Sequence, residues 1–362
     1  MRILVLNWRD IRSPRAGGAE RVTHEVAAGL VLRGHDVTWL SSSGRSLPRD
    51  EAIDGVRVVR RGSEATTRLF APGLARRVGP DVILEEINTL PYLAPLWTRV
   101  PTVLYMNQLA RDVWWYEAPA AVAAAGWLAE PIYLQAYRRC EAITISRSSR
   151  DDLRRLGLGR NVWIAPMAPD AGATKDLPPK RRDGALIAIG RLTPSKRYDH
   201  AIVALADLRR THPHARLTLV GEGRCRDELA GLAAELGVGG SVHLTGRVSL
   251  ADKLRMIDES DILVGSSVRE GWGLTVTEAA ARGVPAVVYD IPGFRDAVIH
   301  ERTGRLVEPY AAALARGAAR LLDDPELYDR LRAAAHRSVP PPTFDAALNV
   351  FEEVLRRVAQ RS

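Results

Sequence analysis

The sequence predicts an α/β protein made of two doubly wound parallel-sheet domains. Short strands rich in β-branched residues alternate with helical patterns along the whole 362-residue chain. Near-continuous apolar strands separated by helices are typical of parallel sheets that are covered on both faces. The alternation stops once, over residues 171–183, and then starts again. A chain of this length exceeds one ordinary core, so we expect two domains.

The N-terminal domain is expected to span residues 1–170, with helical patterns near 19–33 and 120–139. Its strand candidates are Ile3–Asn7, Val37–Leu40, Val56–Val59, Val82–Leu84, Thr102–Met106, Ala142–Ile145 and Val162–Ala165. The first of these strands is too short for a signal peptide. Ligands of open parallel sheets bind at the carboxyl ends of the strands, so we expect the site in the loops that follow them.

Residues 171–183 predict a linker, because prolines and basic residues interrupt the periodic pattern there. The C-terminal domain is expected to span residues 184–342 and to contain a helical region at Tyr310–His336 that a run of prolines at 340–342 ends. Its strand candidates are Leu186–Ile189, Leu217–Val220, Val242–Leu244, Ile262–Val264 and Ala286–Tyr289. Apolar residues at helical spacing within 343–362 predict a last helix, which we expect to pack back on the N-terminal domain.

The net charge of +8 predicts an acidic partner. Nucleic acid, an anionic membrane face and a diphosphate substrate would all qualify. The basic residues are dispersed and no nucleic-acid-binding motif occurs, so we do not expect nucleic acid. No apolar run is long enough to span a membrane, and Cys140 and Cys225 match no metal or redox spacing. We therefore expect a cytoplasmic protein, and a peripheral contact with the inner face of the membrane stays open.

Two loops at expected strand ends are candidates for binding anions. Gly17 and Gly18 precede a helix, where paired glycines allow a ligand to approach the backbone and the helix N-terminus favours anions. A tight turn needed only for packing is the alternative. Arg191 and Lys196 follow the first strand of the C-terminal domain, where a diphosphate would lie. A solvated basic loop is the alternative there.

The strongest candidate is the stretch from Ser266 to Glu278, which follows an apolar strand and opens a helix. Gly271 and Gly273 remove side-chain bulk, so that the N–H groups near Leu274 can face a phosphate. Glu278 lies one turn further along the predicted helix, where a carboxylate can accept two hydrogen bonds from a ribose diol. Glu270 lies ahead of the turn and is expected to face sugar hydroxyls. The alternative is a glycine turn flanked by two solvated glutamates.

These residues resemble the retaining glycosyltransferases of family 4, which have the GT-B fold of two Rossmann-like domains facing across a cleft. The hallmark of that family is a pair of glutamates separated by seven residues around a glycine turn, which Glu270 and Glu278 match. Further matching motifs are Gly17-Gly18, Gly34-His35-Asp36-Val37, Ile145-Ser146-Arg147-Ser148, Gly190-Arg191-Leu192 with Lys196, Gly221-Glu222-Gly223 and Gly283-Val284-Pro285-Ala286. The resemblance covers almost the whole chain.

The resemblance implies a role for each of these residues. Arg191 and Lys196 would bind the diphosphate of the donor, Glu270 its sugar and Glu278 its ribose. The loops of Gly17-Gly18 and Gly271-Trp272-Gly273-Leu274 would complete the donor site. The expected reaction transfers a hexosyl group from a nucleotide diphosphate sugar, with UDP-linked hexose ahead of GDP-mannose, to an acceptor hydroxyl. No metal and no cofactor would be needed.

One position departs from the family. Relatives often carry a histidine near the sugar in the loop after the fifth strand, and Asn107 occupies that place here. Asparagine can bond a sugar hydroxyl but does not titrate near neutral pH. Arg111, further along this loop, is expected to contact a small-molecule, glycan or lipid-linked acceptor, together with an aromatic platform of Trp114, Trp115 and Tyr116. Partly buried core aromatics would give the same pattern.

Other functions remain open on the sequence. A dinucleotide-dependent oxidoreductase is disfavoured, because Arg226 replaces the third glycine of the fingerprint that begins at Gly221. A nucleotide-sugar epimerase of the same architecture and a catalytically silent nucleotide-binding relative both fit the predicted fold.

Overall fold

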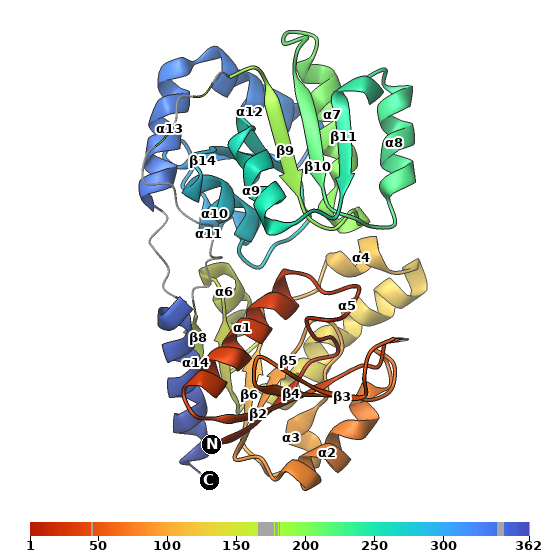
Figure 1. Ribbon diagram of the computed structural model, residues 1–362, viewed down its shortest axis with the longest axis vertical. Helices are drawn as coiled ribbons and strands as arrows, with labels where there is room; N and C mark the ends of the chain where they lie inside the picture. The colour runs from red at the N-terminus through yellow and green to blue at the C-terminus, as the bar shows by residue number, and fades with distance from the viewer. Residues whose placement is uncertain (45, 166–176, 178–179, 181, 339–343, 362) are drawn as a thin grey trace. The chain divides into compact units, whose positions relative to one another are not determined.

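The computed structural model describes residues 1–44, 46–165, 177, 180, 182–338 and 344–361 (Figure 1). Most of the predicted linker 171–183 and the proline run at 340–342 lie outside the described residues. The chain forms two compact units. Unit 1 contains Met1–Arg111, Ala124–Met167 and Thr343–Ser362, and unit 2 contains Asp112–Ala123 and Ala168–Pro342. The segment 112–123, which the sequence placed within residues 1–170, thus belongs with unit 2.

Unit 1 is built on an eight-stranded sheet in the order β3-β4-β2-β1-β5-β6-β7-β8. All neighbouring strands are parallel except β3 and β4, which are antiparallel. The strands are β1 (Arg2–Leu6), β2 (Asp36–Ser41), β3 (Asp50–Ile53), β4 (Val56–Arg60), β5 (Val82–Glu86), β6 (Thr102–Tyr105), β7 (Glu141–Thr144) and β8 (Val162–Ile164). The order along the sheet reverses between β1 and β5, and in doubly wound sheets this reversal marks the ligand side.

The helices of unit 1 flank this sheet (Figure 1). They are α1 (Gly18–Leu32), η1 (Thr67–Phe70), α2 (Ala71–Val78), α3 (Ala94–Trp97), α5 (Ala120–Leu134, whose first turn is counted with unit 2), η2 (Gln135–Tyr137), α6 (Arg147–Arg155) and α14 (Phe344–Ala359). The closing helix α14 contacts α1, β5, β6 and β7. Its Glu352 accepts hydrogen bonds from Arg33 and His35, and these bonds, led by the one from His35, lower the pKa of Glu352 to about 2.

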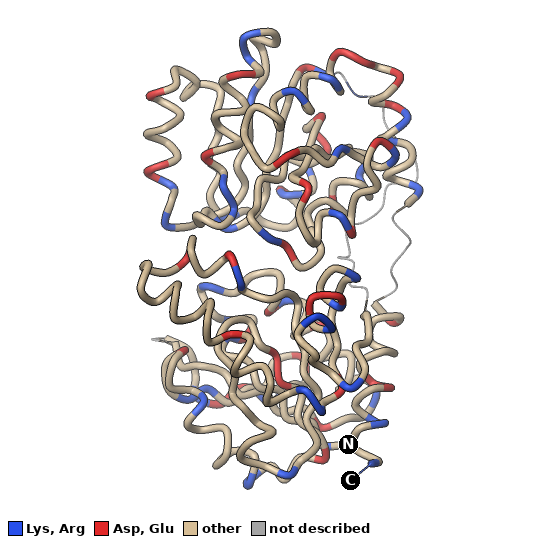
Figure 2. The backbone as a smooth tube through the Cα atoms, turned by 180° about the vertical axis from the view of Figure 1, so that it is seen from behind, with Lys and Arg blue, Asp and Glu red and all other residues tan. Residues whose placement is uncertain are grey.

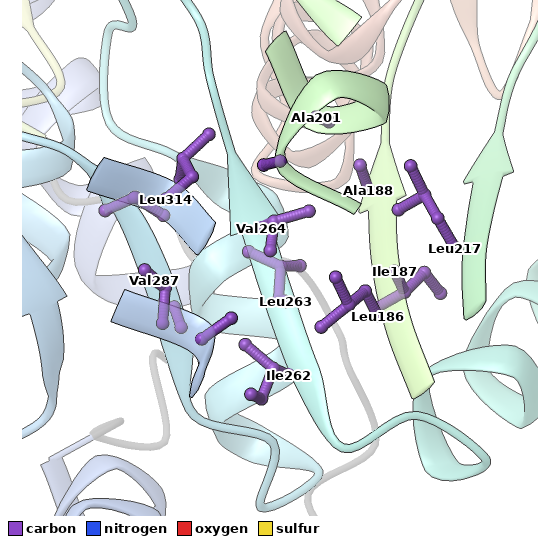
Figure 3. Packing of buried hydrophobic residues seen from close by; sticks show 14 of the residues in the cluster. Leu186, Ile187, Ala188, Ala201, Leu217, Ile262, Leu263, Val264, Val287 and Leu314 are labelled. Atoms are coloured by element: carbon purple, nitrogen blue, oxygen red, sulfur yellow. The ribbon is translucent and has the colours of Figure 1, made fainter. Parts of the chain in front are cut away.

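Unit 2 is built on a six-stranded parallel sheet in the order β11-β10-β9-β12-β13-β14. The strands are β9 (Ala185–Ile189), β10 (Arg216–Val220), β11 (Val242–Gly246), β12 (Ile262–Gly265), β13 (Ala286–Tyr289) and β14 (Gly304–Val307). Side chains of β9, β10, β12 and β13 pack with those of α7 and α12 in one apolar core, part of which Figure 3 shows. The order reverses between β9 and β12, the two strands that precede the predicted donor loops.

The helices of unit 2 are α4 (Val113–Glu117), η3 (Pro194–Lys196), α7 (Tyr198–Leu208), α8 (Arg226–Glu235), η4 (Gly239–Ser241), α9 (Leu250–Asp258), α10 (Leu274–Ala281), α11 (Phe294–Ala297), α12 (Ala311–Asp323) and α13 (Pro325–Ser338). The helical region predicted at 310–336 is two helices, since Pro325 has no N–H to continue α12 and instead begins α13.

Every predicted strand is present, and the fold class is confirmed. Two edge strands, β3 and β14, were not predicted. Both are four residues long and carry charged residues, so they lack the apolar run that marks the central strands. Within the described residues, no helix is long and apolar enough to cross a membrane.

Candidate active site

In unit 2, the loop after β12 places Glu270 against Lys196 of η3. The Oε1 atom of Glu270 lies 2.5 Å from Lys196 Nζ and 2.6 Å from Ser267 Oγ, which donates to it. Ser266 fixes the other side of the contact, because its hydroxyl donates to the backbone carbonyl of Lys196. The two loops that follow β9 and β12 are therefore joined through the two residues that the sequence predicts as donor ligands.

The turn between Glu270 and α10 has the shape that its glycines predict. Gly273 adopts a φ of +94°, and a Cβ there would lie 2.9 Å from a ring carbon of Phe294, so a larger residue would be both strained and crowded. Helix α10 begins at the next residue, Leu274. Trp272 is fixed over the first turns by a hydrogen bond from its Nε1 to Thr277. The positive end of the α10 dipole thus lies directly after Glu270.

Glu278 is buried inside α10 and pairs with a cation that was not predicted. Its Oε1 atom lies 2.5 Å from Nζ of Lys253, on α9, and only 8% of its side chain is exposed. Neither glutamate of the pair is a solvated surface group, because each is held by one lysine from a different element. The alternative of two solvated glutamates around a packing turn is therefore wrong.

Arg191 differs from Lys196 in how its side chain is placed. Its side chain is exposed and forms no hydrogen bond or ion pair with the described residues. The backbone beneath it is fixed, because Leu192 is fully buried and its N–H donates to the carbonyl of Glu222. A fixed loop that presents a free guanidinium beside an ammonium group is suited to bind an oxyanion.

Helix α4 braces the same loop within unit 2. The carboxylate of Glu117 accepts a hydrogen bond from Ser195 Oγ at 2.5 Å, and Arg224 approaches it at 3.3 Å. Trp114 of this helix is buried, with 9% of its surface exposed, whereas Trp115 is 51% exposed. Trp115 therefore offers the more accessible ring, and the acceptor role of Trp114 stays a prediction.

In unit 1, the loop after β1 leads into α1 through Gly17 and Gly18. Helix α1 begins at Gly18, and the N–H of Gly17 donates to Glu20 Oε2 at 2.7 Å. Glu20 is buried and lies 4.0 Å from Arg9. The carboxylate of Glu20 thus accepts from one of the backbone N–H groups that were expected to face a ligand. The role of Gly17 and Gly18 in binding the sugar donor stays a prediction.

The carboxyl end of β5 carries a buried glutamate that binds three other segments of unit 1. Glu86 accepts hydrogen bonds from Asn7 Nδ2 and Thr23 Oγ1, each at 2.5 Å, and from Asn107 Nδ2 at 3.2 Å. Its side chain forms no ion pair with the described residues. Burial is the largest influence and raises the pKa of Glu86 to about 8, against the effect of these hydrogen bonds.

Asn107 has a fixed amide group and a carboxamide oxygen without a partner. The amide nitrogen binds Glu86, the backbone carbonyl accepts from Ser149 Oγ, and the buried Oδ1 atom accepts no hydrogen bond from the described residues. Arg111 is held separately, since its N–H donates to Glu130 and its guanidinium lies 4.3 Å from the ring of Trp127. The acceptor role of Arg111 stays a prediction.

Comparisons with known proteins identify the family. Residues 16–170 match the family described as Glycosyltransferase Family 4, and residues 174–338 match the one described as Glycosyl transferases group 1. The chain is also 30% identical to a glycogen synthase of Mycobacterium tuberculosis (strain ATCC 25618 / H37Rv), over 95% of this chain and 91% of that relative. The chain belongs to glycosyltransferase family 4. The resemblance carried by Glu270 and Glu278 is thereby confirmed at the level of the family.

Solved structures confirm that this family 4 glycosyltransferase has the GT-B fold. Sucrose-phosphate synthase from Thermosynechococcus elongatus superposes with a TM-score of 0.80 at 19% identity, with both chains fully covered. HepE from Anabaena, solved in complex with UDP and glucose, superposes with a TM-score of 0.75 at 19% identity and covers 99% of this chain and 100% of its own.

Sequence reasoning missed three residues that hold the strand-end loops of this glycosyltransferase. Lys253 gave no signal, because a lone lysine on an amphipathic helix is an ordinary surface residue. Glu117 lies in an aromatic segment that was interpreted only through its tryptophans. Glu86 did give a signal, since two glutamates end the apolar run of β5 at the ligand side of the sheet. Among the described residues, no group of histidine, cysteine, aspartate and glutamate side chains is arranged to hold a metal ion.

Proposed function

We propose that the chain is an active retaining glycosyltransferase that moves a hexosyl group from a nucleotide diphosphate sugar to an acceptor hydroxyl. The observation that carries the proposal is the arrangement in unit 2. Two carboxylates flank the start of α10, each bound to a lysine, and the unpaired Arg191 belongs to the same strand-end loop as Lys196.

The proposed roles follow from the chemistry of each group. Arg191 and Lys196 bind the diphosphate and stabilise the negative charge that builds up as it leaves. Glu278 accepts hydrogen bonds from the ribose hydroxyls, and Glu270 accepts them from the transferred sugar. Lys196 then contacts both the carboxylate of Glu270, which binds the sugar, and the diphosphate. It therefore links the sugar half of the donor to its nucleotide half.

The proposed donor is UDP-linked. HepE, which has the same fold, was solved with UDP and glucose, and this supports a UDP-hexose ahead of GDP-mannose. The proposed acceptor is a hydroxyl of a small molecule, glycan or lipid-linked sugar. In the retaining reaction, the acceptor oxygen bonds to the anomeric carbon on the face from which the diphosphate departs. The bond between that carbon and the diphosphate oxygen breaks, and the hydroxyl proton passes to the departing phosphate.

We further propose that no metal takes part. The sequence contains no Asp-x-Asp triplet, which would be a ready carboxylate clamp for a divalent cation beside a diphosphate. Arg191 and Lys196 supply positive charge instead. Transfer should therefore continue in excess EDTA. Loss of activity on chelation, with recovery on adding Mn²⁺, would overturn this part of the proposal.

A thermal-shift screen against UDP, GDP, ADP and TDP tests the donor. A ligand present at 100 times its Kd stabilises the native protein by about 2.7 kcal/mol, so the correct nucleotide should raise the melting temperature and the others should not. The matching nucleotide sugar is then tested for transfer, and NMR of the product reports its anomeric configuration. A product of inverted configuration would exclude a retaining enzyme. Interconversion of the sugar without transfer would indicate an epimerase, and nucleotide binding without any turnover would indicate a silent relative.

A further inference from the structure

The outer face of helix α5 is apolar along most of its length. Residues spaced three or four positions apart on this face are exposed, with Leu128 at 60% and Ile132 at 73%. We call this face the α5 strip; it consists of Ala125, Leu128, Ala129 and Ile132, which all belong to unit 1. Single exposed apolar residues are normal on proteins, but a row of them on one helix face is not.

The strip carries no exposed charge. Glu130 is the single charged residue between positions 118 and 137, and it is only 1% exposed. Its carboxylate is used inside unit 1, where it accepts the N–H groups of Ala110 at 2.6 Å and Arg111 at 2.7 Å. A surface helix of a globular protein ordinarily places charged residues opposite its buried face. Helix α5 instead has apolar residues on both sides.

The side opposite the strip already packs on the interior of unit 1. Leu134 is fully buried in the cluster that contains Leu104 and Met106. The strip is therefore not needed for the core. Because a helix that is apolar all round is buried on every side in its working state, the strip is expected to be covered by a partner.

Further exposed leucines lie close to the end of α5. Tyr133 donates a hydrogen bond to the carbonyl of Thr89 at 2.6 Å, which fixes the loop carrying Leu90 beside the helix. Leu90 is 44% exposed, and Leu96, on the neighbouring helix α3, is 69% exposed. Two further exposed leucines thus lie on segments of unit 1 that neighbour the end of α5.

Arginines border this apolar surface. Arg138 and Arg139 follow η2 directly, and Arg99 follows α3; all three are exposed. Their guanidinium groups form no ion pair with the described residues. Over both units, basic and acidic residues are interspersed along the chain (Figure 2), whereas the α5 strip is uncharged and is followed in the chain by the exposed Arg138 and Arg139. The charge of these arginines is complementary to a surface rich in phosphate groups.

We propose that the α5 strip docks this protein on an anionic lipid bilayer. The helix lies in the plane of the interface, its apolar side chains enter the boundary between headgroups and acyl chains, and Arg138 and Arg139 reach lipid phosphates. A second copy of the chain would also cover the apolar residues but would leave the arginines without anions. The proposal does not depend on the identity of the sugar donor.

Co-sedimentation with vesicles tests the proposal. The wild-type chain should sediment with vesicles of phosphatidylglycerol and phosphatidylcholine, and less so at high salt. It should stay in solution with phosphatidylcholine alone. The double variant Leu128→Glu/Ile132→Glu should lose binding. Leu32→Glu is the matched control, because Leu32 is 89% exposed at the end of α1 and outside the strip, and it should bind as the wild type does. Replacing Arg138 or Arg139 by glutamine should weaken binding about fivefold each, which corresponds to about 1 kcal/mol per arginine.

Three outcomes would overturn docking on lipid. One is a wild-type chain that does not sediment with the anionic vesicles. Another is a Leu128→Glu/Ile132→Glu variant that still binds them. The third is a dimer in lipid-free buffer, seen by light scattering, that this double variant dissociates, since the strip would then be covered by a second copy. Melting curves establish that each variant is folded. A variant that loses vesicle binding but keeps the wild-type rise in melting temperature on adding nucleotide has an intact donor site, so the loss of binding is due to the strip.

Discussion

The carboxylates at the strand ends of the two units are held in opposite ways. In unit 2, Glu270 and Glu278 each pair with a lysine ammonium group at 2.5 Å. In unit 1, Glu86 is bound by two amide groups and a hydroxyl, with no cation among the described residues. Burial is the largest cause that raises the pKa of Glu86 to about 8, and the charge of Glu20 adds to it, because the neutral donors do not offset the loss of solvation.

The difference indicates that the glutamates of unit 2 take part in ion pairs, whereas Glu86 of unit 1 holds neighbouring segments in place. If the diphosphate of a donor binds Lys196, as we propose, it competes with Glu270 for that ammonium group, so this ion pair should change on binding. Glu86 has no mobile counterion to exchange. It holds the ends of β1 and β6 and the helix α1 in one arrangement, and fixes the amide of Asn107.

Removing the cations of unit 2 should have the largest effect. Arg191→Ala or Lys196→Ala should lower kcat by roughly 10²–10³, the scale of lost electrostatic stabilisation of a developing charge. Arg255→Ala is the matched control, because Arg255 is an exposed residue of α9 that pairs only with surface carboxylates. Steady-state kinetics checks this. An unchanged kcat in both folded variants would mean that the loop does not hold the leaving group.

The second prediction concerns Glu278, which forms a buried ion pair with Lys253. Glu278→Ala should weaken nucleotide binding by roughly 1.5–3 kcal/mol, the value of a hydrogen bond to a charged group. The loss should be smaller for a 2′-deoxynucleotide, which offers one hydroxyl fewer. Isothermal calorimetry checks both values, and Glu259→Ala, at an exposed position of the neighbouring segment, is the control. Equal affinity of wild type and Glu278→Ala would exclude the ribose role.

Substitutions of Asn107 test whether unit 1 contributes an uncharged group to the reaction. If Asn107 bonds the donor sugar, Asn107→Ala should lower kcat/KM by about 1–3 kcal/mol, the cost of one lost buried hydrogen bond. Asn107→His should add a limb near pH ~6.5 to a profile that lacks one in the wild type. A variant that melts earlier but keeps kcat/KM would instead show that Asn107 only stabilises its loop.

Glu86 predicts an effect on stability rather than on activity, namely a dependence of stability on pH. Its folded pKa of about 8 lies above the ordinary value of 4.5, so the native state holds the proton more tightly than the unfolded chain. Stability from this group is complete below pH 4.5 and is lost as the pH rises to about 8, by at most about 1.4 kcal/mol per pH unit.

Urea unfolding between pH 5 and 8 measures this slope, and the wild type should lose stability across the range. Glu86→Gln should flatten the slope. The amide nitrogen of glutamine cannot accept a hydrogen bond, so the donors on that side of residue 86 would lose their acceptor and this variant should be less stable at the lower pH. An identical slope in wild type and variant would assign the titration to another group.

The fold was predictable because its information is local. An apolar run such as Ile262–Gly265 predicts the strand that it forms, and a glycine pair such as that around Gly273 predicts the turn in which it lies. The glutamate pair was predictable for the same reason, since both members lie in one loop and the helix after it. Lys253 and Glu278 are 25 residues apart, and Asn7 and Glu86 are 79 apart. Such partners meet only through the sheet order, which the pattern of a single sequence does not contain.

Helix α14 has a consequence for how the protein is made. Phe351 is fully buried and meets the ring of Tyr105 edge to face at 5.0 Å, and Glu352 binds Arg33 from 319 residues further along the chain. Unit 1 therefore lacks part of its core until the ribosome has synthesised the chain as far as α14. The stretch from Ala185 to Ser338 needs no residue of α14 and can fold earlier, so the half that is translated first is the half that is finished last.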